Sequence, residues 1–201
     1  MASIYDLKPR FQGLLRPVTR GLAARGITAN QVTLSALLLS LFGGGLIALF
    51  PQQRWPLLLV PLVMFVRMAL NAIDGMLARE HDMATPLGAV LNELGDVISD
   101  TALFLPFCLV AGLSPALVVL VVVLAIISEM TGVIAVQIGA SRRYDGPMGK
   151  SDRAFVFGLL ALLIGLGVDP QPWADWLLAL VLLLSLLTVA NRVRQALREV
   201  A

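Results

Sequence analysis

The stretch NAIDGMLARE, residues 71–80, ends a run of apolar residues that is long enough to enter a lipid bilayer. A second polar stretch, GAVLNELGD at residues 88–96, follows it closely. Charged side chains inside a membrane are costly and usually face a bundle interior or a water-filled cavity. The two stretches therefore predict a hairpin of membrane helices whose polar faces carry the function.

The composition of the 201-residue chain is typical of an integral membrane protein. Hydrophobic residues make up 58% of the chain and charged residues 14%, with a mean hydropathy of +0.87. A soluble domain of this size could not hide so much apolar surface from water. The small net charge of +2 makes the distribution of charge more informative than its total, and we expect no nucleic-acid partner.

We predict an all-α integral membrane protein with six transmembrane helices and an N-terminal amphipathic helix at the membrane interface. Residues 1–26 form the juxtamembrane helix in this interpretation, although Pro17 is expected to kink or split it. Residues 27–201 form one membrane domain. Each predicted span is near the length that about 30 Å of hydrocarbon requires, and the spans are residues 28–50, 55–79, 86–113, 115–140, 152–168 and 173–193.

Basic residues predict the orientation of these spans. One side of the membrane collects Arg79, the Lys and Arg residues before the first span, those from Arg142 to Arg153 at the start of the fifth span, and those from Arg192 onward at the end of the sixth. The opposite side has only Arg54. The positive-inside rule then places both termini in the cytoplasm and the polar hairpin in the cytoplasmic half of the membrane.

The second and third spans are expected to bring their polar residues together. Each presents three of them on one face: Asn71, Asp74 and Ala78, and then Gly88, Asn92 and Asp96. If the two faces meet, carboxylate and amide oxygens line a cavity open to the cytoplasm, and such oxygens suit Mg²⁺ or Mn²⁺. The alternative is that these residues pair with each other and only hold the helices together.

The spacing of these residues resembles the motif of the CDP-alcohol phosphotransferases, which are six-helix membrane enzymes. That motif reads Asp-x2-Asp-Gly-x2-Ala-Arg-x8-Gly-x3-Asp-x3-Asp. This chain keeps every spacing, with Asn71, Asp74, Gly75, Ala78, Arg79, Gly88, Asn92 and Asp96 at the fixed positions. The stretch ITANQVTLSALL, residues 27–38, is also similar to that family's entry to its first span.

The resemblance implies an enzyme of the bacterial inner membrane that moves a phosphatidyl group from CDP-diacylglycerol to a hydroxyl acceptor and releases CMP, in phospholipid synthesis. It implies a homodimer and a divalent metal, Mg²⁺ or Mn²⁺. The implied metal ligands are Asn71, Asp74, Asn92 and Asp96, and Asp96 is also the implied catalytic base. The implied nucleotide-binding residues are Gly75, Ala78, Arg79 and Gly88.

Two of the four acidic positions of that motif hold asparagine in this chain, Asn71 and Asn92. An amide oxygen can ligate a cation but brings neither negative charge nor basicity. We therefore expect weaker metal binding than four carboxylates would give, with the number of ions, one or two, left open. A catalytically silent binder of CDP-lipid is an alternative function on the same ground.

A deeper polar layer contains Arg67, Asp100 and Glu129, each roughly 20 Å along its span from the cytoplasmic end. Equal depth predicts a midplane charge cluster beneath the metal site, either as a structural ion pair or as a source of the charge missing at Asn71 and Asn92. The rival from another class is a small membrane transporter that uses this layer as an ion relay. The lack of an internal repeat disfavours the transporter.

The segment SRRYDGPMGKSDRAF, residues 141–155, opens the fifth span with several basic residues. In parts of the resembled family, basic residues here hold a phosphate on the acceptor, which makes Lys150 and Arg153 candidates for acceptor binding. The alternative is that anchoring at the cytoplasmic surface explains these residues. The acceptor alcohol stays open: glycerol 3-phosphate, inositol phosphate, free inositol, serine or another lipid.

Overall fold

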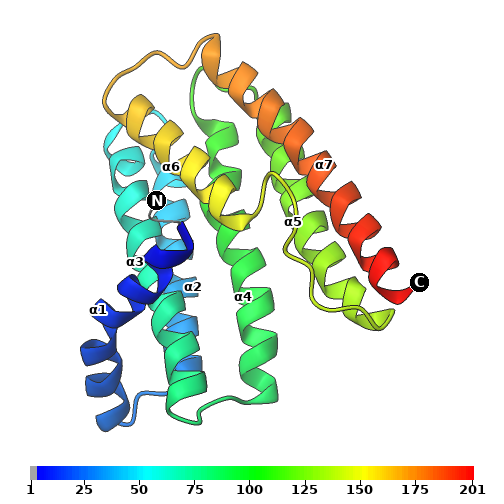
Figure 1. The fold of residues 1–201 in the computed structure, drawn as a ribbon. Coiled ribbons are helices and arrows are strands. Elements are labelled where there is room, and N and C mark those ends of the chain that lie inside the picture. The colour runs from blue at the N-terminus through cyan, green and yellow to red at the C-terminus, as the bar shows by residue number, and fades with distance from the viewer. Residues whose placement is uncertain (1–3) are drawn as a thin grey trace. The chain divides into compact units, whose positions relative to one another are not determined.

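The computed structural model describes residues 4–201, and their side chains from residue 11 onward, so residues 1–3 of the predicted juxtamembrane helix lie outside the described part. The described chain is helical and contains no strand. Its elements in chain order are α1 Ile4–Ala24, α2 Ala29–Leu49, α3 Trp55–Glu80, α4 Pro86–Phe104, the 3₁₀ helix η1 Leu105–Leu109, α5 Pro115–Gln137, α6 Lys150–Gly165 and α7 Trp173–Val200 (Figure 1). Helix α1 runs through Pro17 as one helix, so Pro17 does not split it.

The chain divides into two compact units. The first unit consists of Met1–Leu41 and Leu62–Ser99, and the second of Phe42–Pro61 and Asp100–Ala201. Helices α2, α3 and α4 each contribute residues to both units. The polar stretches 71–80 and 88–96 both belong to the first unit.

Within the described residues, four helices are long and apolar enough to cross a membrane: α2, α3, α5 and α7. Helix α4 has 19 residues but carries the three acidic residues Glu93, Asp96 and Asp100. Helix α6 has only 16 residues. The structure therefore confirms an all-helical fold with four candidate spans, and the two further spans stay predictions.

Local sequence signals fix where the helices around the hairpin begin. Before α2, Thr28 Oγ1 accepts a hydrogen bond from the Gln31 N–H at 3.3 Å, and Gln31 Oε1 accepts one from the Thr28 N–H at 2.9 Å. This reciprocal pair is a capping box. At α4, Thr85 Oγ1 accepts a hydrogen bond from the Gly88 N–H at 2.9 Å. Pro86 suits the first turn of this helix because a backbone N–H, which proline lacks, would have no partner there. These caps set the register of the polar residues on α2 and α4.

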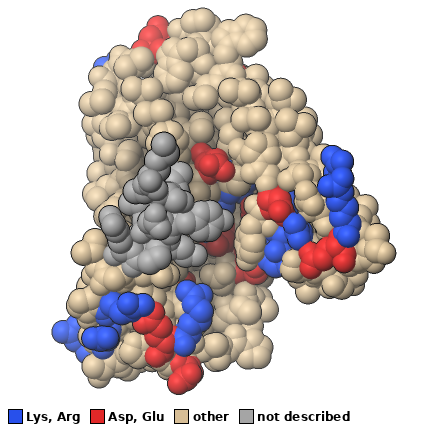
Figure 2. Space-filling model, in the orientation of Figure 1, with Lys and Arg blue, Asp and Glu red and all other residues tan. Residues whose placement is uncertain are grey.

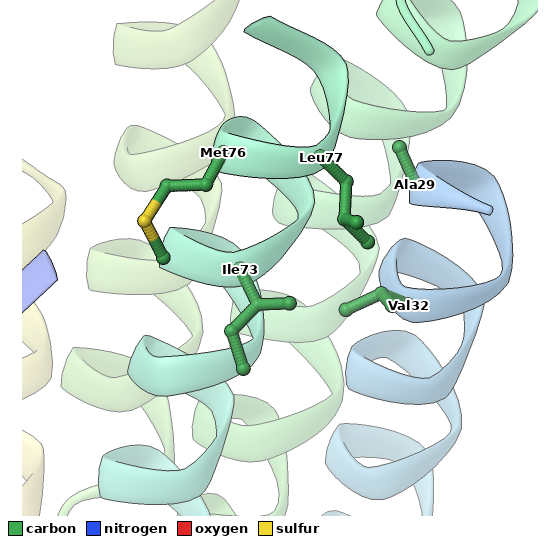
Figure 3. Packing of buried hydrophobic residues seen from close by; sticks show 5 residues of the cluster. All are labelled: Ala29, Val32, Ile73, Met76 and Leu77. Carbon is green, nitrogen blue, oxygen red and sulfur yellow. The ribbon is translucent and has the colours of Figure 1, made fainter. Parts of the chain in front are cut away.

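Helices α1, α2 and α3 pack around one apolar cluster in the first unit. Its buried members are Ala29, Val32, Ile73, Met76 and Leu77. Figure 3 shows Leu77 of α3 and Val32 of α2 pointing toward one another, and Leu15 and Leu22 of α1 pack against the cluster. Because Ile73 precedes Asp74 directly, this packing also fixes where α3 presents Asp74.

In the second unit, α5 and α7 lie side by side (Figure 1). Phe104 stacks on Phe157 with ring centroids 4.3 Å apart, and Phe107 meets Phe157 edge-on at 5.2 Å. A Cβ at Gly44 would collide with the carbonyl oxygen of Ala102. Glycine at position 44 therefore lets the backbones of α2 and α4 approach closely, as small residues do between membrane helices.

Candidate functional site

A pocket of about 250 Å³ in the first unit is lined by residues of both polar stretches. Six of the eight motif residues line it: Asp74, Gly75, Ala78, Arg79, Gly88 and Asn92. The structure thus brings together two of the four predicted metal ligands, Asp74 and Asn92, and all four predicted nucleotide-binding residues. Helix α2 also contributes three lining residues that were not predicted: Ala29, Asn30 and Thr33.

Asp74 is held in the wall of this pocket by a side chain from another helix. Its exposed fraction is 6%, and its Oδ2 accepts a hydrogen bond of 2.8 Å from the Thr33 hydroxyl. A buried carboxylate needs such donors because burial removes its water. Thr33 therefore positions Asp74, and it does so from the stretch 27–38 that resembles the family's first span.

Asn71 and Asp96, which are not among the lining residues, contact each other. Asn71 Nδ2 donates to Asp96 Oδ1 at 3.2 Å. Arg67, one turn before Asn71 on α3, points its Nη2 at the same oxygen at 3.4 Å and at the Asp96 carbonyl oxygen at 3.3 Å. The Asp96 carboxylate therefore lies between an amide donor and a buried guanidinium.

Two motif glycines make room for polar side chains at the pocket. A Cβ at Gly75 would lie 2.8 Å from Arg79 Nη2, so the guanidinium of Arg79 folds back over its own helix. A Cβ at Gly88 would lie 2.7 Å from Asn30 Oδ1 and 3.1 Å from Thr85 Oγ1. Glycine at these positions thus allows a close approach that a larger residue would obstruct.

The donors of the motif fit a divalent cation that prefers oxygen. Among the described side chains, no group of three or more His, Cys, Asp or Glu residues is arranged so that it could hold a metal ion. The predicted ligands are instead two carboxylates and two amides, of which Asp74 and Asn92 line the pocket. Hard oxygen donors of this kind suit Mg²⁺ and Mn²⁺ better than softer metals.

Asp100 and Glu129, two residues of the predicted midplane charge cluster, lie among arginines of the second unit. Glu129 of α5 lies 2.9 Å from Arg153, 3.3 Å from Arg142 and 3.4 Å from Arg192, measured between side-chain oxygen and nitrogen atoms. The Arg153 guanidinium also lies 3.9 Å from Asp100. Arg142 and Arg192 were missed as partners of Glu129, although both stood out as basic residues near span ends.

The predicted cluster of Arg67, Asp100 and Glu129 joins residues of both units and stays a prediction. The contacts described inside the first unit include Arg67 with Asp96, and those inside the second include Arg153 with Asp100 and Glu129. Arg153, predicted to bind the acceptor, is fully buried in these ion pairs. Lys150, the other predicted acceptor residue, is the half-buried first residue of α6.

We expect Thr33→Val to destabilise the protein by about 1.5–3 kcal/mol, because it removes a hydrogen bond to a buried carboxylate while keeping the side-chain shape. The measurement is thermal unfolding of the purified protein in detergent. Thr33→Ser is the matched control, since it keeps the hydroxyl. Equal unfolding midpoints for the two variants would show that the Thr33 hydroxyl does not hold Asp74.

Comparison with known proteins identifies the family. Residues 26–193 match the model of the CDP-alcohol phosphatidyltransferase family. The chain is 46% identical over 195 residues to the inner membrane protein YnbA of Escherichia coli (strain K12), covering 97% of this chain and 96% of that protein. It is 30% identical over 211 residues to the phosphatidylinositol phosphate synthase of Mycolicibacterium smegmatis, covering 96% of this chain and 90% of that protein.

Solved structures share the fold. The phosphatidylinositol phosphate synthase of Mycobacterium tuberculosis, with CDP-DAG bound, superposes with a TM-score of 0.75 at 24% identity and covers 90% of this chain and 92% of its own. The same enzyme in complex with manganese and citrate also gives 0.75 at 24% identity and covers 90% and 87%. On the family match over residues 26–193 and the relatives of nearly full length, this chain belongs to the CDP-alcohol phosphatidyltransferase family.

Proposed function

We propose that this protein transfers a phosphatidyl group from CDP-diacylglycerol to the hydroxyl of an acceptor and releases CMP, as a step of phospholipid synthesis. The observation that carries the proposal is the pocket of the first unit, where six residues of the family motif line one cavity. The solved relative with CDP-DAG bound supports this choice of donor. The relative solved with manganese supports a divalent cation, Mg²⁺ or Mn²⁺.

The motif residues divide the work in this proposal. Asn71, Asp74, Asn92 and Asp96 would hold the cation, which when bound supplies positive charge against the diphosphate of the donor. Gly75, Ala78, Arg79 and Gly88 shape the space for the nucleotide. Asp96 takes the proton of the acceptor hydroxyl. The acceptor oxygen then bonds to phosphorus as the bond from phosphorus to the CMP oxygen breaks.

The donor diphosphate needs charge neutralisation from protein groups as well. Arg79 lines the pocket, and its guanidinium folds over Gly75. A guanidinium is permanently charged and presents several donors in one plane, which suits phosphate oxygens. Arg79 therefore contributes to holding the diphosphate beside Asp74 and Asn92. The acceptor side is proposed at the start of α6, where Lys150 and Arg153 lie.

We expect Gly88→Ala to weaken the binding of CDP-diacylglycerol by about tenfold, a loss of about 1.4 kcal/mol. The added methyl group would press on the Asn30 and Thr85 side chains, at 2.7 and 3.1 Å, and displace them within the pocket. The measurement is equilibrium binding of labelled CDP-diacylglycerol in detergent. Gly95→Ala on the same helix is the control, because its Cβ would meet only Thr33 Cγ2 at 3.8 Å. Equal affinities would contradict a nucleotide beside Gly88.

We also propose six membrane spans, in which α4 with η1 and then α6 join the four apolar helices. The acidic residues that make α4 too polar are held by protein groups: Asp96 contacts Arg67 and Asn71, and Asp100 contacts Arg153. Such pairing is what lets ionisable residues lie inside a membrane.

We further propose an N-terminal interfacial helix, a location in the bacterial inner membrane and a homodimer. Residues 1–26 form an interfacial helix before the six-span domain 27–201, and the protein lies in the bacterial inner membrane with both termini in the cytoplasm. The name of the Escherichia coli relative, an inner membrane protein, supports this location. A homodimer is proposed from the family resemblance.

The decisive experiment incubates the purified protein with CDP-diacylglycerol, Mg²⁺ or Mn²⁺ and a panel of alcohols, and follows CMP. Release of CMP that requires both the cation and an alcohol supports the transferase. Binding of CDP-diacylglycerol without release of CMP favours a catalytically silent binder. This is the second candidate function, because Asn71 and Asn92 bring no negative charge to the motif. If the protein neither binds CDP-diacylglycerol nor releases CMP, the proposal is refuted. That result would favour a transporter that uses Arg67, Asp100 and Glu129.

A further inference from the structure

A second pocket, which we call the loop pocket, lies in the second unit where segments at several helix ends come together. Its volume is about 350 Å³. Its lining comes from the loop before α3 with the first turn of that helix, from the residues after η1, and from the end of α6 with the loop that follows. Arg54 and Asp169 are its two charged lining residues. None of the eight described motif residues lines it, so the proposed transfer reaction gives this pocket no role.

Backbone hydrogen bonds at the end of α6 fix one wall of the loop pocket. The Gly167 N–H donates to the Ile164 carbonyl oxygen at 2.9 Å, and the Val168 N–H donates to the Leu163 carbonyl oxygen at 3.0 Å. This pair is a Schellman motif, in which Gly167 adopts the left-handed conformation with φ of 99°. The wall is therefore ordered by the chain itself and does not need a ligand to form.

The two charged side chains of the loop pocket are exposed and do not pair with each other. Within the described residues, the Arg54 guanidinium has no hydrogen bond and no ion pair. A Cβ at Gly167 would lie 2.8 Å from Arg54 Nη1, so glycine lets this guanidinium lie against the loop. Asp169 Oδ1 accepts a hydrogen bond from the Gln171 N–H at 3.0 Å, while its Oδ2 has no partner in the described part of the chain. Figure 2 shows red and blue atoms at the top left of the view, over the loop between α6 and α7, in a surface that is otherwise uncharged there.

Aromatic and apolar side chains beside the loop pocket are typical of a membrane surface. Phe50 and Trp55 flank the lining residues 51–54, their ring centroids are 5.5 Å apart, and both side chains are exposed. Tryptophan is enriched at the headgroup level of membranes. Leu109 and Leu166, each adjacent in sequence to a lining residue, are also exposed. A ligand with a polar head and apolar chains fits such a surface better than a water-soluble ligand does.

We propose that the loop pocket binds the headgroup of a zwitterionic phospholipid, with the phosphate at Arg54 and a primary ammonium group at Asp169. A guanidinium presents several donors to phosphate oxygens, and an ammonium group offers three donors to a carboxylate. The amide groups of Gln52 and Gln53, which also line the pocket, supply further donors to the phosphate. The inference goes beyond the proposed transferase function and depends only on the proposed location in a membrane.

Two other classes of phospholipid fit the loop pocket less well. A quaternary ammonium group has no N–H to donate to Asp169 and is bound instead by aromatic rings, and the described lining contains no aromatic side chain. An anionic headgroup would place Asp169 against a ligand without positive charge. Arg54 and Asp169 together give the lining a formal charge of zero, which matches a headgroup of zero net charge.

The first test is native mass spectrometry of the full-length protein in detergent. The protein is mixed with equimolar phosphatidylethanolamine, phosphatidylglycerol and phosphatidylcholine that carry the same acyl chains. We expect it to retain phosphatidylethanolamine at least about threefold more than either of the others, a modest factor because the ion pairs are exposed. Equal retention of the three lipids, or a preference for one of the other two, would overturn the inference.

Matched variants assign this preference to the loop pocket. Asp169→Asn keeps an oxygen that can accept from the Gln171 N–H, and it should bring the retention of phosphatidylethanolamine down to that of phosphatidylglycerol. Arg54→Gln should reduce the retention of phosphatidylethanolamine by at least about threefold. Both side chains are exposed, so both variants should fold. Arg198→Gln, which removes an exposed arginine of α7, is the control and should behave as the wild type. A preference that survives both Arg54→Gln and Asp169→Asn would overturn the inference.

The last test separates a lipid from a soluble ligand with the same charged groups. The unfolding midpoint is measured with phosphatidylethanolamine in mixed micelles, or with the same concentration of phosphoethanolamine in solution. We expect only the lipid to raise the midpoint of the wild type, and Asp169→Asn to lose that rise. An equal rise with phosphoethanolamine would overturn the assignment to a lipid. None of these measurements follows CMP, so an inactive transferase would refute the proposed function and leave this inference standing.

Discussion

Purified Asp96→Asn protein should release CMP from CDP-diacylglycerol at least about 100-fold more slowly than the wild type. General base catalysis by a positioned side chain contributes rate factors of about this size or more. An amide cannot take the proton of the acceptor hydroxyl, whereas its oxygen can still accept the hydrogen bonds that Asp96 receives from Asn71 and Arg67. The substitution therefore removes basicity and preserves most of the local packing.

The control for this prediction is Glu93→Gln, which removes the same charge from the same helix three residues earlier. Glu93 is not one of the motif residues. The Glu93→Gln variant should therefore release CMP within about twofold of the wild-type rate, because substitutions away from buried or functional groups have small effects. The two variants are compared in one CMP assay after both are shown to be folded. Release by Asp96→Asn at the wild-type rate would place the base elsewhere and leave Asp96 as a structural partner of Arg67.

The geometry at Asp96 gives a physical reason for one departure from the family motif. Asn71 donates its amide hydrogen to Asp96 Oδ1 at 3.2 Å. An aspartate at position 71 would instead place a second negative charge against Asp96 and could donate only if it were protonated. The amide thus donates a hydrogen bond to Asp96 without adding a second negative charge beside it. Asparagine at position 71 therefore lowers the negative charge of the motif and at the same time provides the hydrogen-bond donor that contacts Asp96.

Spacing along the chain predicted much of the site. Asp74 and Ala78 lie four residues apart, and so do Gly88 and Asn92, so each pair falls on one helix face whatever the neighbours are. A short turn then brings both faces into one pocket. The capping signals of Thr28 and Thr85 could likewise be read from sequence, because a cap acts within four residues.

Contacts that depend on how the helices pack could not be predicted in this way. Thr33 reaches Asp74 across 41 positions, and nothing in the first span distinguishes Thr33 from the other hydroxyl residues near it. Depth along a helix grouped Arg67 with Asp100 and Glu129, and that cluster stays a prediction because depth does not set rotation about the helix axis. Arg67 points its guanidinium at Asp96, and the partners of Glu129 include Arg192 near the end of the chain.

Replacing Glu129 should cause the largest loss of stability, about 3–5 kcal/mol for Glu129→Leu, because removing one partner leaves the others as uncompensated buried charges. Three guanidinium groups share this carboxylate, and Arg153 and Arg192 have exposures of 0% and 1%. They cannot turn to solvent without disrupting α5, α6 and α7. The measurement is the unfolding midpoint and the yield of folded protein extracted in detergent.

A matched control and a double variant separate this effect from a general loss of charge. Glu199→Gln removes an exposed carboxylate that pairs with Arg143 and not with the arginines around Glu129. An exposed ion pair contributes about 0–1 kcal/mol, and Arg143 keeps Asp145 as a partner. Glu129→Leu with Arg153→Leu should cost less than the sum of the single changes, because residues in one network do not act independently. Additive losses, or equal losses for Glu129→Leu and Glu199→Gln, would mean that Glu129 does not organise the arginines.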